Sequence, residues 1–177
     1  GQRGIEGKFV AIKYCRTHNV PTFGICLGMQ CIVIEFARNV LGYADANSRE
    51  MDEKTPHNVI DIMEEQKSIT NMGGTMRLGA YECVIDPNSK TYEAYQSEHI
   101  QERHRHRYEF NNNFREEIEN KGMQITGTSP TGELVETDAS TGKWQELTPT
   151  LSTTCAVFPH SNTRVQAQQG DYAWALW

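Results

Sequence analysis

Residues 22–30 read Thr-Phe-Gly-Ile-Cys-Leu-Gly-Met-Gln. The short apolar run at 22–25 is consistent with a buried parallel strand, and apolar residues then recur at helical spacing over 27–41, with Gly42 as the helix stop. Residues 8–18 have the mixed spacing of a short surface helix. A helix, a strand, a sharp turn and a second helix in succession are typical of a doubly wound α/β sheet. We therefore predict an α/β fold with a doubly wound, mostly parallel central sheet and flanking helices.

Past residue 50 the apolar pattern predicts a series of shorter elements. The expected strands cover 59–63, 80–85, 123–128 and 133–136, and an expected helix covers 113–120. The stretch 137–177 is rich in Thr, Ser and Gln and has little periodicity. We predict one domain over 1–136, followed by an atypical C-terminal segment at 137–177.

The composition describes an ordinary globular protein and excludes several classes of partner. Of 177 residues, 37% are hydrophobic and 23% charged, and the net charge is −6. This balance gives no support for nucleic acid or an anionic membrane as a partner, and no apolar run could span a bilayer. The five cysteines lack zinc-type spacing, so we expect no metal site and a reducing, cytoplasmic compartment. Because the chain lacks both an initiator Met and a signal peptide, we expect a piece of a longer protein.

Cys26 is the candidate nucleophile. A cysteine at a sharp strand-to-helix turn is exposed to substrate, and Gly24 and Gly28 leave room for a strained turn and a close-packed helix. The helix N-terminus is expected to lower the thiol pKa, and its free N–H groups can bind an oxyanion. The alternative is a buried structural thiol, which is the role we expect for Cys31 and Cys83.

Four further motifs make the sequence recognisable. The run 24–30 resembles the nucleophile elbow of class I glutamine amidotransferases, a motif that several families share. The rest of the resemblance points to the glutaminase domain of the CTP synthase family. It rests on residues 3–8 (Arg-Gly-Ile-Glu-Gly-Lys), 46–48 (Ala-Asn-Ser), 72–79 (Met-Gly-Gly-Thr-Met-Arg-Leu-Gly) and 102–111 (Glu-Arg-His-Arg-His-Arg-Tyr-Glu-Phe-Asn). The resemblance covers residues 1 to about 136 and implies a flavodoxin-like, N-terminally truncated amidotransferase domain.

This resemblance implies an activity and a set of partners. The domain would hydrolyse L-glutamine through a thioester on Cys26 and supply ammonia for the amination of UTP to CTP. A synthetase domain of the same polypeptide would bind ATP, Mg and UTP, so no cofactor is expected in the present domain. The full enzyme would form a homo-tetramer.

The resemblance also implies the glutamine-binding residues. Glu50 and Arg107 match positions that hold the amino and carboxylate groups of glutamine, and Gly1 matches the last glycine of an oxyanion-hole loop. The start of the following helix completes the expected substrate site with Leu27, Gly28, Met29 and Gln30. A zwitterionic substrate does need one anion and one cation, and the fork of arginine suits a carboxylate. On spacing alone, Glu50 and the charged run 104–107 would be solvated surface charges.

The general base is the part of the site that departs from the family. The family supplies it in a Gln-Phe-His-Pro-Glu-Phe segment, and this chain has only His160, in Phe158-Pro159-His160-Ser161. One hypothesis is that 137–177 is translated out of frame, which sequencing of the gene would test. The rival is a genuine divergent tail with His160 as the base. If no base exists, the alternative function is a catalytically impaired module of the same fold with a regulatory or interaction role.

Overall fold

The stretch 22–30 forms the strand–turn–helix unit that the sequence predicts. The computed structural model of the chain describes residues 4–18, 20, 22–62, 77–140, 155–158 and 174–176. Strand β1 (Thr22–Ile25) leads into helix α2 (Leu27–Phe36), which continues as the π-helical segment η1 (Ala37–Leu41). Gly42 ends the helix with a φ of 88°, the left-handed conformation that favours glycine. The predicted helix over 27–41 and its stop are therefore confirmed.

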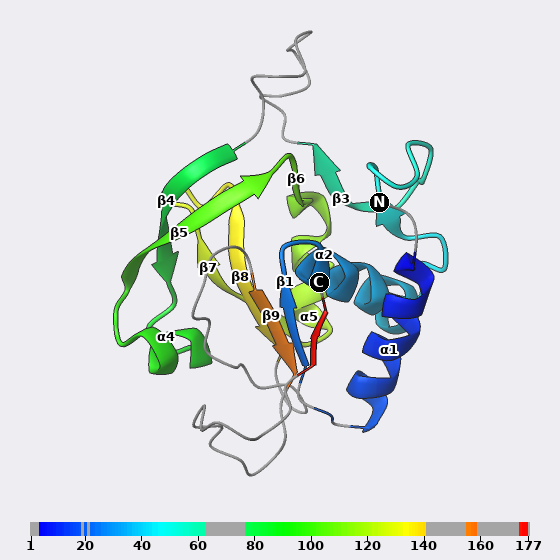
Figure 1. Cartoon of the computed structure of the whole chain (residues 1–177), viewed down its shortest axis with the longest axis horizontal. Coiled ribbons are helices and arrows are strands. Elements are labelled where there is room, and N and C mark those ends of the chain that lie inside the picture. Colours follow the sequence, from blue (N-terminus) through cyan, green and yellow to red (C-terminus); the bar gives the residue numbers. More distant parts are fainter. Residues whose placement is uncertain are drawn as a thin grey trace, which may run out of the picture.

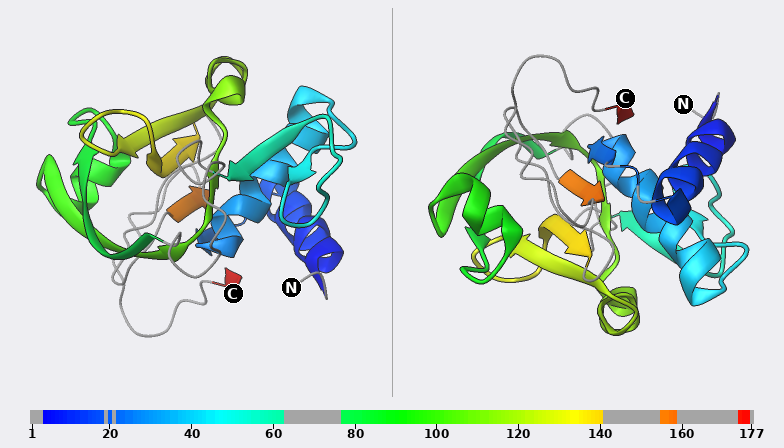
Figure 2. Two further views of the ribbon diagram at one scale, coloured as in Figure 1. Left: turned by 90° about the horizontal axis from the view of Figure 1, so that it is seen from above. Right: turned by 90° about the horizontal axis from the view of Figure 1, so that it is seen from below.

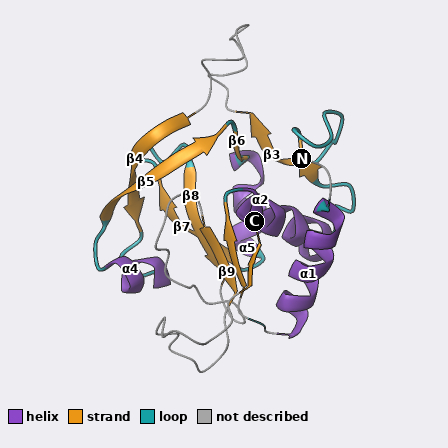
Figure 3. Ribbon diagram, viewed as in Figure 1, coloured by secondary structure: helices purple, strands orange, loops and turns teal. Residues whose placement is uncertain are grey.

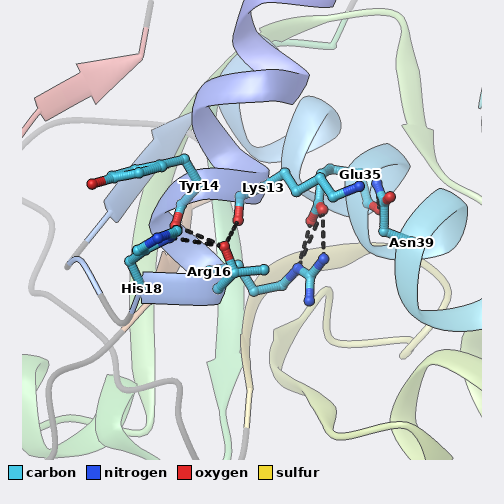
Figure 4. Close-up of polar contacts among 7 residues, drawn as sticks. Lys13, Tyr14, Arg16, His18, Glu35 and Asn39 are labelled. Carbon is cyan, nitrogen blue, oxygen red and sulfur yellow. Dashed lines mark hydrogen bonds and ion pairs between the residues drawn. The ribbon is translucent and has the colours of Figure 1, made fainter.

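Helix α1 (Ile5–His18) lies against α2 beside the elbow strand (Figure 1). It begins three residues before the predicted helix and buries Ile5, Phe9 and Ile12, which share one face because of their helical spacing. Residues 28–36 of α2 are all buried, as expected for a helix that is covered on every side. Figure 4 shows an ion pair between these helices, in which Arg16 of α1 meets Glu35 of α2.

Seven of the described strands form the larger sheet, in the order β10-β1-β9-β8-β7-β4-β5. The six strands besides β1 are β4 (Arg77–Ile85), β5 (His99–His106), β7 (Met123–Thr128), β8 (Val135–Ser140), β9 (Cys155–Phe158) and β10 (Trp174–Leu176). The elbow strand lies between β10 and β9, so residues from the C-terminal segment flank it on both sides.

The larger sheet confirms only part of the predicted fold. The α/β class is confirmed, but the doubly wound, mostly parallel arrangement is not. Only the β10–β1 and β8–β9 pairs are parallel, and the four other described pairs are antiparallel. The connection between β7 and β8 explains one of them, because residues 129–134 form a tight turn closed by the Ser129 N–H to the Leu134 carbonyl at 2.9 Å. A parallel pair would need a crossover of a dozen or more residues.

A smaller sheet lies beside the helices and carries part of the candidate site. It contains β2 (Asn47–Ser48), β3 (Asn58–Ile62) and β6 (Tyr108–Phe110), in the order β2-β3-β6. Figure 3 shows α1, α2 and β3 together on one side of the molecule, with β4 and β5 on the other. The view along the perpendicular direction in Figure 2 gives the same division. The site therefore lies where the smaller sheet meets the elbow.

The remaining elements test the other predictions. Segments η2 (Asn112–Phe114) and α5 (Arg115–Asn120) confirm the helix expected at 113–120, and β3, β4 and β7 confirm their strands. The strand expected at 133–136 begins later, at Val135, and runs on to Ser140. The structure adds helix α4 (Lys90–Tyr95), which begins after Ser89, whose Oγ accepts a hydrogen bond from the Tyr92 N–H. In the described part of the chain, no helix has the length and apolar character to cross a membrane.

Candidate active site

Cys26 has a strained backbone at the point where β1 becomes α2. Its φ is 53° and its ψ −110°, and only one other described non-glycine residue, Gln96, has a positive φ. Such a conformation costs about 1–3 kcal/mol and persists where the surrounding structure enforces it. The N–H of Gln30 donates to the Cys26 carbonyl at 3.1 Å, which fixes the first turn of the helix on the cysteine. This geometry is that of a nucleophile elbow.

Gly24 is required for the close approach of strand and helix. A Cβ atom at this position would lie 2.6 Å from Cδ1 of Ile32, and 2.7 and 2.8 Å from the backbone carbon and oxygen of Gly28. The last two contacts are with backbone, which cannot give way cheaply. The close packing predicted from the two glycines is therefore present at Gly24.

The electrostatics of Cys26 differ from the expectation. Burial raises the pKa of the Cys26 thiol, a hydrogen bond from the Leu27 backbone lowers it, and the carboxylates of Glu109 and Glu50 raise it further. The contribution of the helix N-terminus has the predicted sign, but the loss of solvation outweighs it. The helix N-terminus therefore lowers the thiol pKa as predicted, but burial and the two carboxylates leave that pKa raised overall.

The first turn of α2 is tied to the segment that contains Arg107. Gln30 is buried, and its Nε2 donates to the backbone carbonyl of Tyr108 at 2.9 Å. Arg107 precedes Tyr108 at the bend between β5 and β6 and is half-buried, while Glu109 follows it. Residues far apart in the sequence thus meet beside the elbow, and Arg107 is next in sequence to this contact.

Glu50 lies in the turn that follows β2. Its side chain is exposed, and its N–H donates to Oγ of Ser48 at 3.2 Å. Its carboxylate is near enough to Cys26 to influence the thiol. The structure therefore brings Glu50 into the surroundings of the nucleophile, which spacing along the sequence could not have predicted.

Sequence reasoning gave no role to Glu109, although it lies in the quoted motif 102–111. Its side chain lies on β6 and is 4% exposed. Its carboxylate raises the pKa of the Cys26 thiol more than that of Glu50 does. On β3 its partner in register is another buried acid, Asp61. A carboxylate between two aromatic residues of the motif was the available signal, since an acid is rarely buried without a charged partner or a function.

Several predicted positions play other parts or cannot be placed. Gly1 and His160 lie outside the described residues. Gly28, Met29 and Gln30 are buried and Leu27 is half-buried. These residues would therefore contact a substrate through the backbone of the turn. His104 is fully buried on β5 with its ring edge-on to Tyr81, so it is not the solvated surface residue that spacing alone suggests. In the described ranges, no cluster of three or more His, Cys, Asp or Glu side chains could hold a metal ion.

The two carboxylates give a prediction for the reactivity of the thiol. Because Glu109 raises the pKa of Cys26, replacing it with glutamine should lower that pKa, so the thiolate forms at lower pH. The measurement is the rate of Cys26 alkylation by iodoacetamide against pH, followed on the Cys26 peptide by mass spectrometry. Glu93→Gln on the exposed side of α4 is the control. A midpoint for Glu109→Gln at or above that of the wild type would contradict this electrostatic role.

Comparison with known proteins agrees with this geometry. The family model for class-I glutamine amidotransferases matches residues 1–144. A CTP synthase from Bacteroides fragilis is 68% identical over 164 residues, covering 90% of this chain and 31% of its own length. One from Bacteroides thetaiotaomicron is 77% identical over 136 residues, covering 77% of this chain and 25% of its own. The solved glutaminase domain of Trypanosoma brucei CTP synthase, with bound acivicin, superposes with a TM-score of 0.75 at 37% identity, over 90% of this chain and 59% of that one.

The fold and the strained cysteine define an α/β protein with a nucleophile elbow. The chain belongs to the class-I glutamine amidotransferases, a family of enzymes. Within that family it corresponds to the glutaminase domain of CTP synthases, which its relatives and its structural neighbour represent. The chain spans about a third of the length of the Bacteroides fragilis relative, 31% of it.

Proposed function

We propose that the chain hydrolyses L-glutamine by acyl transfer to Cys26. The observation that carries the proposal is the strained Cys26 at the elbow, with Glu50 and Glu109 acting on its thiol and Arg107 next to the segment that Gln30 holds. An anion and a cation around one nucleophile suit a free amino acid, whose ammonium and carboxylate need opposite partners. The structural neighbour's ligand, acivicin, is a glutamine analogue, which agrees with this substrate.

The chemistry follows from the elbow. The Cys26 sulfur attacks the side-chain amide carbon of glutamine, and the oxyanion of the tetrahedral intermediate accepts hydrogen bonds from backbone N–H groups at the start of α2. The proton of the Cys26 thiol passes to the amide nitrogen, the C–N bond breaks, ammonia leaves, and a γ-glutamyl thioester remains. Water attacks the thioester, releasing glutamate and restoring the thiol. In this scheme Glu50 binds the α-ammonium and Arg107 the α-carboxylate. Gly1 would complete the oxyanion hole, and His160 remains the predicted base.

The elevated thiol pKa suggests how the reaction is limited to its substrate. Burial is the largest cause of the raised pKa, and the carboxylate of Glu50, the proposed ligand of the substrate ammonium, adds to it. An ammonium bound by Glu50 would offset that contribution. Binding of glutamine would thereby lower the thiol pKa, and the nucleophile would become reactive when substrate is present. An idle elbow would stay protonated and less prone to oxidation.

In the full-length protein we infer that the ammonia aminates UTP to CTP in a synthetase domain that binds ATP and Mg, within a cytoplasmic homo-tetramer. The present domain needs no cofactor of its own for the chemistry above.

We also propose that 137–177 completes the domain of 1–136, since β8, β9 and β10 pair in the sheet of β1. The doubly wound, flavodoxin-like arrangement stays a prediction for an experimental structure of the full-length protein. The impaired-module alternative is not favoured by the relatives.

A trapping experiment tests the proposed function. Incubating the chain with L-glutamine and quenching in acid should leave a γ-glutamyl adduct on the peptide that contains Cys26, detected by mass spectrometry. An adduct on Cys15 or Cys31 instead would place the nucleophile elsewhere. Ammonia release without any adduct on Cys26 would contradict the thioester route, and neither adduct nor ammonia would favour the impaired module.

A further inference from the structure

Arg49 directly precedes Glu50, and β3 holds both its backbone and its side chain. Its N–H donates to the Ile60 carbonyl at 2.9 Å, and its Nε lies 2.8 Å from Oδ1 of Asp61 in an ion pair. The Arg49 side chain is 40% exposed, whereas that of Asp61 is 11% exposed. The pair therefore joins a half-exposed cation to an anion fixed at the edge of the core.

Two further contacts fix the Asp61 carboxylate. The N–H of Ile62 donates to its Oδ1 and Nδ2 of Asn58 to its Oδ2, each at 2.7 Å. A carboxylate held from both oxygens has little rotational freedom, and the guanidinium that pairs with it is held in turn. Asp61 is thus an anchor for the residue before Glu50.

The turn around Glu50 is closed from its other side by Ser48. The Ser48 carbonyl accepts hydrogen bonds from the N–H groups of Met51 and Asp52, both at 2.9 Å, while its Oγ accepts that of Glu50. With Arg49 tied to β3 and Ser48 buried in β2, the backbone of Glu50 is fixed in both chain directions. The Cα–Cβ bond of Glu50 therefore leaves the turn in a defined direction.

The charge of Arg49 gives the ion pair a second consequence. A guanidinium one residue from Glu50 would compete with a substrate ammonium for the Glu50 carboxylate if it were not held elsewhere. Resting on the proposed role of Glu50 as ammonium ligand, we propose that the Arg49–Asp61 ion pair positions Glu50 for the α-ammonium of glutamine and keeps the Arg49 guanidinium from that carboxylate. Arg49 and Asp61 are positioning residues, and the selectivity of the site for α-amino acids depends on them.

Binding selectivity in the full 177-residue chain tests this proposal. In a Cys26→Ser background, dissociation constants for L-glutamine and for glutaramate, which lacks the α-ammonium, are measured by calorimetry. Asp61→Asn should weaken L-glutamine binding ~10-fold, the size expected for one charge-assisted contact, while glutaramate binding stays within ~2-fold. General damage to the fold would weaken the binding of both ligands alike. The diagnostic quantity is therefore the selectivity ratio, which is the dissociation constant of glutaramate divided by that of L-glutamine.

Four further variants separate the possible failures. Arg49→Gln is at a half-exposed position, so it keeps the test informative if Asp61→Asn fails to fold, and it too should reduce the ratio. Adding Asp61→Asn to it should reduce the ratio no further, because the two residues act as one unit. Lys90→Gln, in the exposed pair on α4, is the control. An unchanged ratio in Arg49→Gln overturns the positioning role if Glu50→Gln lowers it, whereas an unchanged ratio in Glu50→Gln overturns the proposed role of Glu50 itself.

Discussion

Ammonia release from L-glutamine is expected to fall by at least ~10³-fold when Cys26 is replaced by alanine, because loss of the nucleophile removes the covalent route. Alanine also keeps the Cβ of cysteine, so the strained φ of 53° should be no more costly in the variant than in the wild type. The variant should therefore fold as well as the wild type and bind glutamine. The measurement is ammonia production over time at saturating glutamine, with the synthetase domain of a relative supplied in a parallel series.

Cys15→Ala is the matched control for this variant. Cys15 is a half-buried thiol on α1 without a part in the proposed chemistry, so its removal should leave the rate unchanged. Ammonia release by Cys26→Ala at the wild-type rate would show that another group is the nucleophile. Loss of release in both variants would point instead to damage of the packing between α1 and α2.

The local elements around the elbow could be predicted because short-range chemistry determines them. Gly24 indicates a close approach of two backbone segments, and Gly42 indicates a helix that ends in the left-handed conformation. Both features can be predicted from the residue type alone. The strand and helix that Cys26 joins follow from apolar spacing in the same way. These features need no knowledge of what packs around them.

The sheet arrangement and the site electrostatics depend on distant contacts and were predicted less well. Strands β9 and β10 come from a stretch with little periodicity, and nothing in that stretch says that both flank β1. The pKa of the Cys26 thiol also depends on residues that are distant in the sequence. The N-terminus of α2 is visible in the sequence, but the burial of Cys26 and the approach of Glu109 exist only in the folded chain.

The packing of α1 against α2 involves an ion pair, Arg16–Glu35, that the pattern of apolar residues does not predict. Glu35 lies on the helix predicted at 27–41, where a single acid is usually assigned to a solvent-exposed face. In the structure its side chain is fully buried, and Arg16 of α1 contacts both carboxylate oxygens, with Nε to Oε2 at 2.9 Å and Nη2 to Oε1 at 2.8 Å (Figure 4). The Arg16 side chain is 16% exposed, so its charge retains some contact with water.

This asymmetry predicts unequal effects of removing each partner. Arg16→Met leaves an uncompensated carboxylate in the core and should reduce the free energy of unfolding by about 3–5 kcal/mol. Glu35→Gln leaves the arginine at the edge of the core, where water can still reach it, so the loss should be smaller. Urea unfolding followed by circular dichroism measures both changes, and the exposed Lys90→Met on α4 should change stability little.

The double variant Arg16→Met, Glu35→Met distinguishes attraction between the charges from the cost of burying one alone. If most of the loss in Arg16→Met comes from the stranded carboxylate, removing that carboxylate as well should restore stability to the wild-type value or above it, as replaced buried ion pairs often do. Two single losses that simply add in the double variant would mean that packing of the long side chains, and not charge, holds α1 against α2. Because α2 carries Cys26 at its first turn, the restored variant should also recover the glutaminase rate of the wild type.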